Sequence, residues 1–403
     1  MISKLFPEGS FRRKCVKGVR LVHPAGILEN AALAWEEGRI VFVGSVEDAP
    51  SGWDEVVLDG LTIAPGLIDT HVHGAVGCDF MMRSKDAYGS ICKTHAAGGT
   101  TSLLVTTVTA ALEDVYEVLK FAEAYRTSGN AEGSRILGAH IEGPFLSPQR
   151  PGIHDTHLMR TPTIEIADRL FSAGLAVRLI TLAPELPGSA EFIAYIQSKG
   201  ALASGGHSDA WESDLTEPFH AGLRRVTHTF NCMSTARKRG PLREAGLLEF
   251  ALSEPAIRCE AIADGAHIPQ TLLRMLYRAK GEEGITLITD ASSACGLKEG
   301  EEFEIAGTRC RILNGLALAA DGSALAGSCL TMWEAVCGMV RLVEVPLHVA
   351  IGMASWIPAR DFGWADEMGE LKVGSRADFI VFDHQMRLKA TFMDGNLVAS
   401  KEV

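Results

Sequence analysis

The chain has 403 residues, a formal net charge of −12 and 47% hydrophobic residues, so it can bury the core of a large domain with a smaller one beside it. The acidic balance argues against a nucleic-acid surface and against an anionic membrane, and an anionic substrate would need a local basic pocket. No secretory signal pattern opens the chain, and no apolar run approaches the roughly 18 residues of a membrane span. Nine cysteines without paired spacing are typical of reduced thiols. We therefore expect a cytoplasmic protein that binds neither nucleic acid nor membrane.

The two ends of the chain share one character. Residues 16–61 carry alternating patterns and turn signals without long helices, and residues 374–383 look the same. We expect both ends to form one small β-sandwich domain, made of residues 1–63 and 360–403. Residues 64–359 between them are expected to form a separate barrel.

Eight short β-branched or aliphatic runs alternate with amphipathic helical patterns through the middle of the chain. The predicted strands are residues 67–73, 102–108, 135–142, 176–183, 201–207, 225–230, 257–264 and 286–290. Helical patterns between them include residues 114–126, 164–173, 190–199 and 269–280. Eight such units predict a closed (β/α)₈ barrel. The alternative is an open doubly wound sheet, but no Gly-x-Gly-x-x-Gly turn follows the first strand.

Two histidines, His71 and His73, end the first predicted strand. Side chains two residues apart on a strand point the same way, so both imidazoles can face one divalent ion. Gly74 lets the backbone turn away directly afterwards. Alone, the pair could equally be hydrogen-bonded in a polar pocket.

Further ligand-type side chains stand where other predicted strands end. They are Glu142, His207, His228 and Asp290, at the ends of the third, fifth, sixth and eighth strands. Active sites of (β/α)₈ enzymes lie at the carboxyl ends of the strands. Any one of these residues could be a satisfied rim residue, but together with the histidine pair they predict a metal site.

Several motifs resemble one family nearly end to end. They are Pro65–Asp69, His140–Leu146, Gly206–Ser208, Thr227–Met233, Ile262–His267, Thr289–Ala291 and Leu325–Ser328. The chain resembles the amidohydrolase superfamily, and within it the branch of N-acetylglucosamine-6-phosphate deacetylases. The Glu-Gly-Pro-Phe-Leu and Ala-Asp-Gly-x-His motifs are specific to that branch. The resemblance implies hydrolysis of the N-acetyl group to give glucosamine 6-phosphate and acetate.

The resemblance also implies the metal ligands. It makes Glu142, His207 and His228 the ligands of the main ion. Because His71 and His73 are both present, a second ion with Glu142 bridging is also expected, which gives one or two ions per subunit. The alternative is that only one site fills. Zinc is the expected metal, and iron, cobalt and manganese stay open.

Asp290 is implied as the general base and then the general acid. A carboxylate there can take a proton from a metal-activated water and pass it to the leaving amine. The alternative from the residues alone is an aspartate that caps the following helix.

The resemblance assigns the remaining site residues to the substrate. Phosphate contacts fall to Arg243 and His267, with Asn231 and the backbone of Cys232 beside them. His154, with Ile153 next to it, is expected at the sugar or the acetyl carbonyl. Leu325, Ala326 and Gly327 are expected near the acetyl methyl group. In this family the arginine comes from the neighbouring subunit, which implies a homodimer in which Arg243 reaches the other active site.

One segment departs from the family pattern. Residues 234–242 are longer and more basic than expected, with Arg237, Lys238 and Arg239 in succession. These cations could reshape the phosphate end, admit a different anionic acetamido sugar, or form a solvated loop.

Other functions stay open beside the deacetylase. The substrate could be N-acetylgalactosamine 6-phosphate or another N-acyl amino sugar. Cyclic-amide hydrolases often use a modified lysine at the end of strand four, where this chain has no lysine in residues 181–185. An inactive scaffold relative would usually have lost ligands that are all present here.

Overall fold

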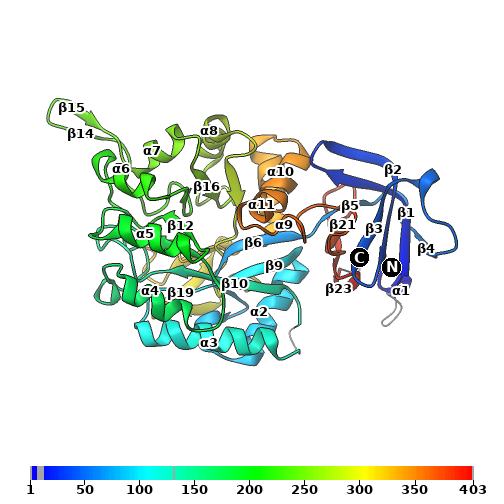
Figure 1. The fold of residues 1–403 in the computed structure, drawn as a ribbon, viewed down its shortest axis with the longest axis horizontal. Coiled ribbons are helices and arrows are strands. Elements are labelled where there is room, and N and C mark those ends of the chain that lie inside the picture. Colours follow the sequence, from blue (N-terminus) through cyan, green and yellow to red (C-terminus); the bar gives the residue numbers. More distant parts are fainter. Residues whose placement is uncertain (1, 7–12, 130–131, 402–403) are drawn as a thin grey trace.

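We describe residues 2–6, 13–129 and 132–401 of a computed structural model of the chain. Figure 1 shows a barrel of strands and helices at one side of the molecule and a separate sheet at the other, where both chain ends lie. The separate sheet contains strands from both ends of the sequence. The prediction of a barrel with a small β domain from both chain ends is confirmed, whereas its residue boundaries stay a prediction.

Eight parallel strands form the barrel wall. They are β6 (Leu67–Val72), β9 (Thr100–Thr106), β10 (Arg135–Glu142), β11 (Val177–Leu182), β12 (Leu202–Gly205), β13 (Arg225–Val226), β16 (Arg258–Ala261) and β17 (Ile285–Leu287). Their spatial order is β17-β16-β13-β12-β11-β10-β9-β6. A parallel bridge from Val72 to Ala291 joins the two ends of this order, so the sheet is nearly closed. Each strand lies within a predicted run or overlaps it.

Helices cover the barrel on its outer face. They are α2 (Lys85–Ala97), α3 (Leu112–Thr127), α4 (Ile164–Phe171), α5 (Ser189–Ser198), α6 (Glu212–His220), α7 (Leu247–Ser253), α8 (Gln270–Lys280), α9 (Met332–Gly338), α10 (Leu347–Met353) and α11 (Trp356–Asp361). In α3, Val115, Val118, Leu119 and Ala122 are buried at helical spacing, which turns one apolar face to the sheet. All seven residues of β9 are buried, as expected for a parallel strand covered on both faces.

The end sheet pairs the two termini of the chain. Its strands are β1 (Arg13–His23), β2 (Gly26–Glu36), β3 (Arg39–Ser45), β4 (Asp54–Val57), β5 (Thr62–Pro65), β21 (Phe379–Phe382), β22 (Leu388–Met393) and β23 (Asn396–Ser400). Antiparallel pairing of β21 with β5 joins the C-terminal strands to the N-terminal ones. Trp35, Phe379 and Phe392 are buried together in its core, and the rings of Phe379 and Phe392 stack at 4.5 Å. The short helix α1 (Ile2–Leu5) lies against this sheet.

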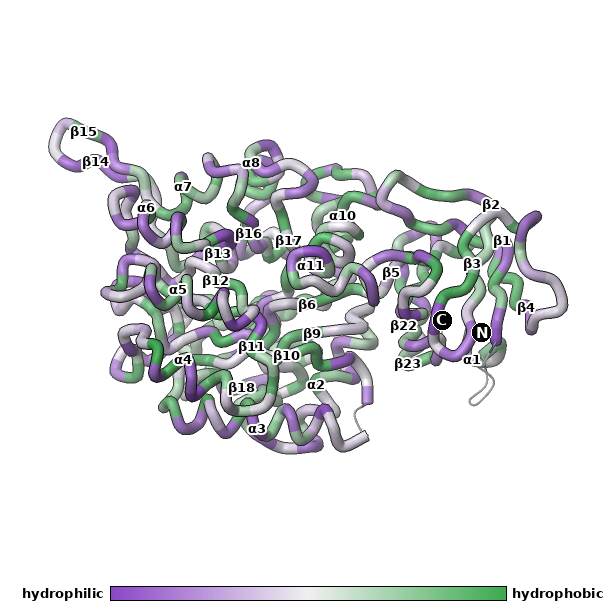
Figure 2. The backbone as a smooth tube through the Cα atoms, viewed as in Figure 1, coloured by the Kyte–Doolittle hydropathy of each residue, from purple (hydrophilic) through white to green (hydrophobic). Residues whose placement is uncertain are grey.

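Three small sheets fall outside the predicted set. The strands β7 (Gly74–Ala75) and β8 (Cys78–Asp79) pair directly after β6. A three-stranded antiparallel sheet of β18 (Glu302–Ile305), β19 (Thr308–Leu313) and β20 (Leu316–Ala319) follows the last barrel strand. A hairpin of β14 (Arg237–Arg239) and β15 (Leu242–Glu244) projects from the end of the molecule farthest from the end sheet (Figure 1). Figure 2 shows hydrophilic colours along β14, and its three residues are exposed. The basic segment is therefore an extended arm.

Among the described residues, no helix is long and apolar enough to cross a membrane. All nine cysteines are unpaired in this structure.

Candidate metal centre and substrate pocket

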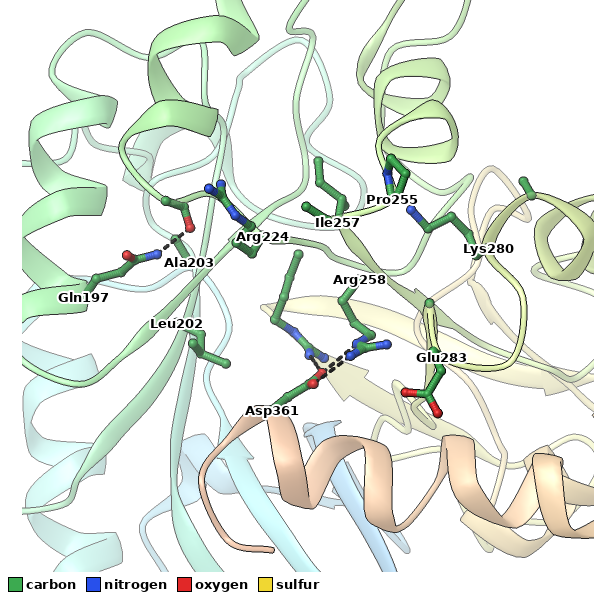
Figure 3. Close-up of a pocket in the computed structure, with 15 residues that line it drawn as sticks. Gln197, Leu202, Ala203, Arg224, Pro255, Ile257, Arg258, Lys280, Glu283 and Asp361 are labelled. Carbon is green, nitrogen blue, oxygen red and sulfur yellow. Dashed lines mark hydrogen bonds and ion pairs between the residues drawn. The ribbon is translucent and has the colours of Figure 1, made fainter. Parts of the chain in front are cut away.

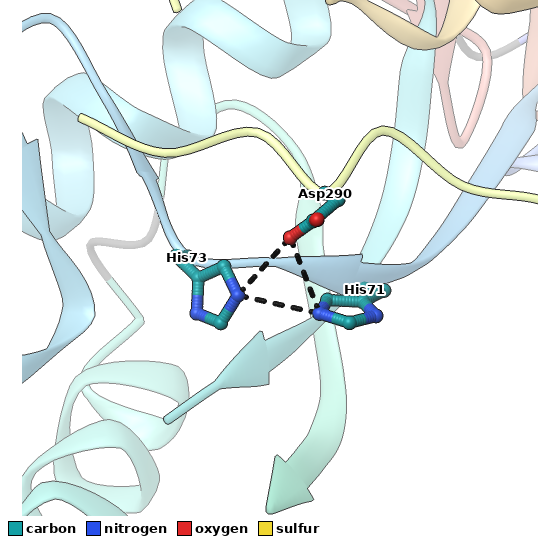
Figure 4. Close-up of side chains that lie close together, drawn as sticks. All are labelled: His71, His73 and Asp290. Carbon is teal, nitrogen blue, oxygen red and sulfur yellow. Dashed lines mark hydrogen bonds and ion pairs between the residues drawn. The ribbon is translucent and has the colours of Figure 1, made fainter. Parts of the chain in front are cut away.

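The histidine pair at the end of β6 lies against the carboxylate of Asp290, which follows β17. The Nε2 atoms of His71 and His73 lie 3.2 Å apart, and Oδ1 of Asp290 lies 3.3 Å from each of them (Figure 4). The backbone N–H of Asp290 donates to the carbonyl of His71, which fixes this approach. These three side chains form one group that could hold a metal ion.

A second set of ligand atoms faces the first across Glu142. This carboxylate ends β10, is 2% exposed, and places Oε2 at 3.0 Å from His73 Nε2. Its other oxygen, Oε1, lies 3.2 Å from His228 Nε2 and 3.3 Å from His207 Nε2. Glu142 therefore stands between both sets, which is the geometry expected of a bridging carboxylate.

Strained backbone presents three of these side chains. His207, His228 and Asp290 come just after β12, β13 and β17, and their φ angles are +47°, +30° and +49°. Residues other than glycine rarely adopt such angles, and their occurrence at active sites is well known. The strands therefore end before the ligands, and each side chain is turned inward over the barrel mouth.

The charges of this cluster favour a bound cation. Burial opposes charge on His73, yet Asp290 and Glu142 raise its pKa to about 9. Burial also opposes charge on His207, but contacts with Cys232 and Glu142 raise its pKa to about 10. Burial alone would raise the pKa of Glu142, but the charge of His71 and contacts with His207 and His228 hold it well below its usual range. A divalent ion can replace the protons that this electrostatic field attracts, so the residues fit a metal.

His154 differs from the other site histidines in its hydrogen bonding. The backbone N–H of Thr109 donates to His154 Nδ1 at 3.1 Å, so the ring proton must sit on Nε2. Burial lowers the pKa of His154 to about 3, which keeps the ring neutral. Although its nitrogen lies near Glu142 and His207, this tautomer makes His154 a hydrogen-bond donor to the pocket rather than a ligand.

His267 lines another part of the pocket, where its surroundings favour the protonated ring. Its Nδ1–H donates to Asp264 Oδ2 at 2.6 Å, while Asp264 Oδ1 accepts the backbone N–H groups of Ala266 and His267. Burial disfavours the cation, but contact with Asp264 raises the pKa of His267 overall. An imidazolium suits a phosphate, and this acidic chain needs such a local cation.

One cavity of about 210 Å³ brings most of the predicted residues together. Its lining includes His73, Glu142, Ile153, His154, His207, His228, Asn231, Cys232, His267, Asp290, Leu325 and Gly327. His71 lies behind the lining and is fully buried, and Ala326 is buried in the core of the β18–β20 sheet. Arg243 lies on the exposed arm, outside this lining.

A larger cavity of about 600 Å³ lies elsewhere, beside the first residues of β12, β13 and β16. One wall carries Arg225, which pairs with Asp361. Arg258 pairs with the same carboxylate (Figure 3). Neither group of potential metal ligands is part of this cavity. Because the active sites of such barrels lie at the opposite ends of the strands, we place the functional site in the smaller cavity.

Several residues that support the site were absent from the predicted set. Asp264 orients His267, Thr109 fixes the tautomer of His154, and Glu260 lies behind His71. Asp69 accepts hydrogen bonds from the backbone of His71 and from Thr289, which ties β6 to the residues after β17. For Asp69 and Glu260 a signal existed, because each is the only carboxylate of a short, largely buried strand.

Comparison with known proteins identifies the family. Residues 62–398 match the amidohydrolase family. The chain belongs to this family. It is 29% identical to N-acetylglucosamine-6-phosphate deacetylase of Vibrio furnissii, over 97% of this chain and 96% of that protein. It is 32% identical to N-acetylgalactosamine-6-phosphate deacetylase of Escherichia coli O157:H7, over 94% of this chain and 98% of that protein.

A solved structure agrees with this assignment. It is a variant of N-acetyl-D-glucosamine-6-phosphate deacetylase from Mycobacterium smegmatis in complex with N-acetyl-D-glucosamine-6-phosphate. The TM-score is 0.88 at 30% identity, and the match covers 97% of this chain and all of that one.

Proposed function

We propose that this protein is a metal-dependent deacetylase that hydrolyses N-acetylglucosamine 6-phosphate to glucosamine 6-phosphate and acetate. The observation that carries the proposal is the content of the 210 Å³ cavity: ligand-type histidines and carboxylates, the neutral donor His154 and the cation His267 line one space. Such a space suits an acetamido group at the metal and a phosphate at His267. The activity of the curated relatives supports this substrate class.

The metal of the proposal is zinc, bound as one or two ions per subunit. Glu142, His207 and His228 would hold the main ion, and His71 and His73 a second one, with Glu142 between them. When bound, the metal lowers the pKa of water and polarises the acetyl carbonyl. Iron, cobalt and manganese accept the same nitrogen and oxygen ligands.

The protein's own residues move the protons. Asp290 accepts a proton from the attacking water and then delivers it to the amine nitrogen as the carbon–nitrogen bond breaks. His154 donates its Nε2 proton in a hydrogen bond to the acetyl oxygen, where negative charge develops. Ile153, Leu325 and Gly327 line the pocket beside the acetyl group, with Ala326 behind them.

Phosphate recognition uses His267 together with Asn231 and the backbone of Cys232. Arg243 completes it from a second subunit, because the arm of β14 and β15 projects away from its own chain (Figure 1). The proposed assembly is therefore a homodimer, in the cytoplasm.

The epimeric substrate is a second candidate, since one curated relative acts on N-acetylgalactosamine 6-phosphate. A cyclic-amide hydrolase is disfavoured because no lysine stands among residues 183–185, which follow strand β11; Glu185 there accepts hydrogen bonds from Ser208 and Asp209.

Acetate release tests the proposed function. N-acetylglucosamine 6-phosphate, its galacto epimer and unphosphorylated N-acetylglucosamine are compared at equal concentration with zinc-loaded protein. We expect fast release from a phosphorylated sugar and at least a hundredfold lower kcat/KM without the phosphate. Equal rates with and without the phosphate would contradict the assigned substrate class, and no release from any of them would contradict the activity.

A further inference from the structure

A buried ion pair lies directly behind the metal cluster. Glu260 on β16 is fully buried, and its Oε2 lies 3.3 Å from Nδ1 of His71. The other oxygen, Oε1, lies 3.5 Å from Nη2 of Arg225, which is 2% exposed on the neighbouring strand β13. Glu260 therefore joins a charged residue near the opposite end of the barrel to a candidate metal ligand.

The chain of contacts continues away from the site. Asp361 holds Arg225 at 2.9 Å and also accepts two hydrogen bonds of 2.7 Å from Arg258. These three groups border the 600 Å³ cavity at the amino-terminal ends of the strands (Figure 3). Because a buried carboxylate is costly without a charged partner, the contact with Arg225 compensates for the burial of Glu260 beside His71.

His71 needs one particular tautomer to act as a ligand. Its Nε2 faces His73, Glu142 and Asp290 at 3.2 to 3.3 Å, so this nitrogen must keep its lone pair. The proton of the neutral ring must then sit on Nδ1, where Glu260 accepts it. Among the other candidate ligands, His207 finds a backbone carbonyl, that of Arg150, for its Nδ1 proton. The Nδ1 atoms of His73 and His228 have no hydrogen-bond partner among the described residues. His71 is the candidate ligand with a carboxylate in that position.

We propose that Glu260, held by Arg225, is a positioning residue that fixes the ring and tautomer of His71 for metal binding. This inference rests on the proposed metal dependence. A carboxylate that accepts the second ring proton of a ligating histidine orients the ring and raises its basicity, and losing it costs roughly 10- to 100-fold in metal affinity. Glu260 also accepts the backbone N–H of His228 at 3.4 Å, so the same oxygen touches both sides of the centre.

The substitution Glu260→Gln separates charge from size. If the new amide oxygen faces Arg225, its NH₂ group faces His71 and favours the wrong tautomer. If the oxygen faces His71 instead, the NH₂ group meets the guanidinium of Arg225, and two donors oppose each other. Both arrangements weaken the ligand, whereas the volume of the side chain is kept.

The test measures metal binding rather than turnover. Metal-free protein is titrated with zinc in a competing chelator, and ions per chain are counted for wild type, H71A, E260Q and E260D. The H71A variant identifies the ion that His71 holds. We expect E260Q to weaken the same ion roughly 10- to 100-fold and the conservative E260D to fall between it and wild type. If E260Q does not fold, E260D alone carries the test.

A matched control removes a buried ion pair far from the metal. Arg135 and Asp378 pair at 2.6 Å, and Asp378 is 6% exposed. Asp378→Asn should lower thermal stability without changing zinc affinity. Wild-type zinc affinity in E260Q, or an equal loss in D378N, would overturn the inference, and so would an H71A variant that keeps every ion. Acetate release by the wild type is measured separately. A failure of the proposed deacetylase activity is then distinct from a failure of the positioning role of Glu260.

Discussion

The pairing of Asp264 with His267 leads to a pH-dependent prediction for phosphate binding. Asp264→Asn keeps an oxygen for the backbone N–H groups of Ala266 and His267 but turns an NH₂ group toward the imidazole. The ring then loses the carboxylate that raises its pKa while burial still lowers it, so we expect the value to fall to the ordinary 6.5 or below. The variant should therefore lose the cation as the pH rises above that value, whereas the wild type keeps it to higher pH.

The size of the effect follows from the distance to the ordinary pKa. About pH 8 lies at least roughly 1.5 pH units above the pKa expected for the ring in the variant, and each unit is worth about 1.4 kcal/mol. A variant that has lost a cation kept by the wild type at this pH should bind the phosphate roughly 2 kcal/mol less tightly, which is a KM for the phosphorylated sugar raised roughly thirtyfold. At about pH 5 more of the ring is protonated in the variant, so the KM ratio should be smaller than at pH 8.

The assay is the KM for N-acetylglucosamine 6-phosphate at these two pH values, as the ratio of variant to wild type. The ratio cancels the titration of the substrate itself. Asp321→Asn is a matched control, because Asp321 also accepts a backbone N–H two residues on but lies outside the pocket lining. A KM ratio that does not change with pH, or an equal rise for the unphosphorylated sugar, would refute the role given to His267.

Three further predictions follow from the same geometry. Asp290→Asn should keep its metal but lose at least a hundredfold in kcat with little change in KM, and normal turnover would remove Asp290 from the mechanism. Mixing D290N with R243A should restore activity. In a mixed dimer, the R243A subunit keeps Asp290 and receives Arg243 from the D290N subunit, so one site is intact. Two variants that stay inactive when mixed would place Arg243 outside the partner's site. Burial lowers the pKa of His95 to about 4, below the ordinary 6.5. Protonation of this ring therefore favours the unfolded state. The contribution of His95 to the free energy of unfolding is complete above pH 6.5 and is lost as the pH falls toward 4. At about pH 5 this loss is roughly 2 kcal/mol, and urea unfolding of His95→Gln should show a pH dependence weaker by that amount.

The barrel strands could be predicted because their apolar runs are strong and locally encoded. Strand β10 covers Arg135–Glu142, the same residues as its predicted run, and ends on the carboxylate that the sequence singled out. The sheet of β18–β20 was not predicted from the sequence, because its residues alternate between buried and exposed over only four to six positions. The arm escaped because β14 is exposed throughout and has no buried face to signal a strand.

The sequence predicted which residues gather in the pocket better than it predicted the residues that support them. Residue type and position at a strand end were enough to single out His71, Glu142 and Asp290. The donor role of His154 depends on the backbone of Thr109, which lies 45 residues earlier in the chain. The role of Glu260 depends likewise on Arg225 in another strand. Such partners are set by the register between strands, which a single sequence does not reveal.

Metal titration of turnover tests the central claim most directly. The protein is stripped with a chelator, dialysed and supplied with zinc in steps, while the initial rate of acetate release from N-acetylglucosamine 6-phosphate is followed. We predict negligible release by the stripped protein and a rate that rises with bound zinc until one or two ions per chain are held. Full activity in the stripped protein, or none in the zinc-loaded protein, would contradict a metal-dependent deacetylase.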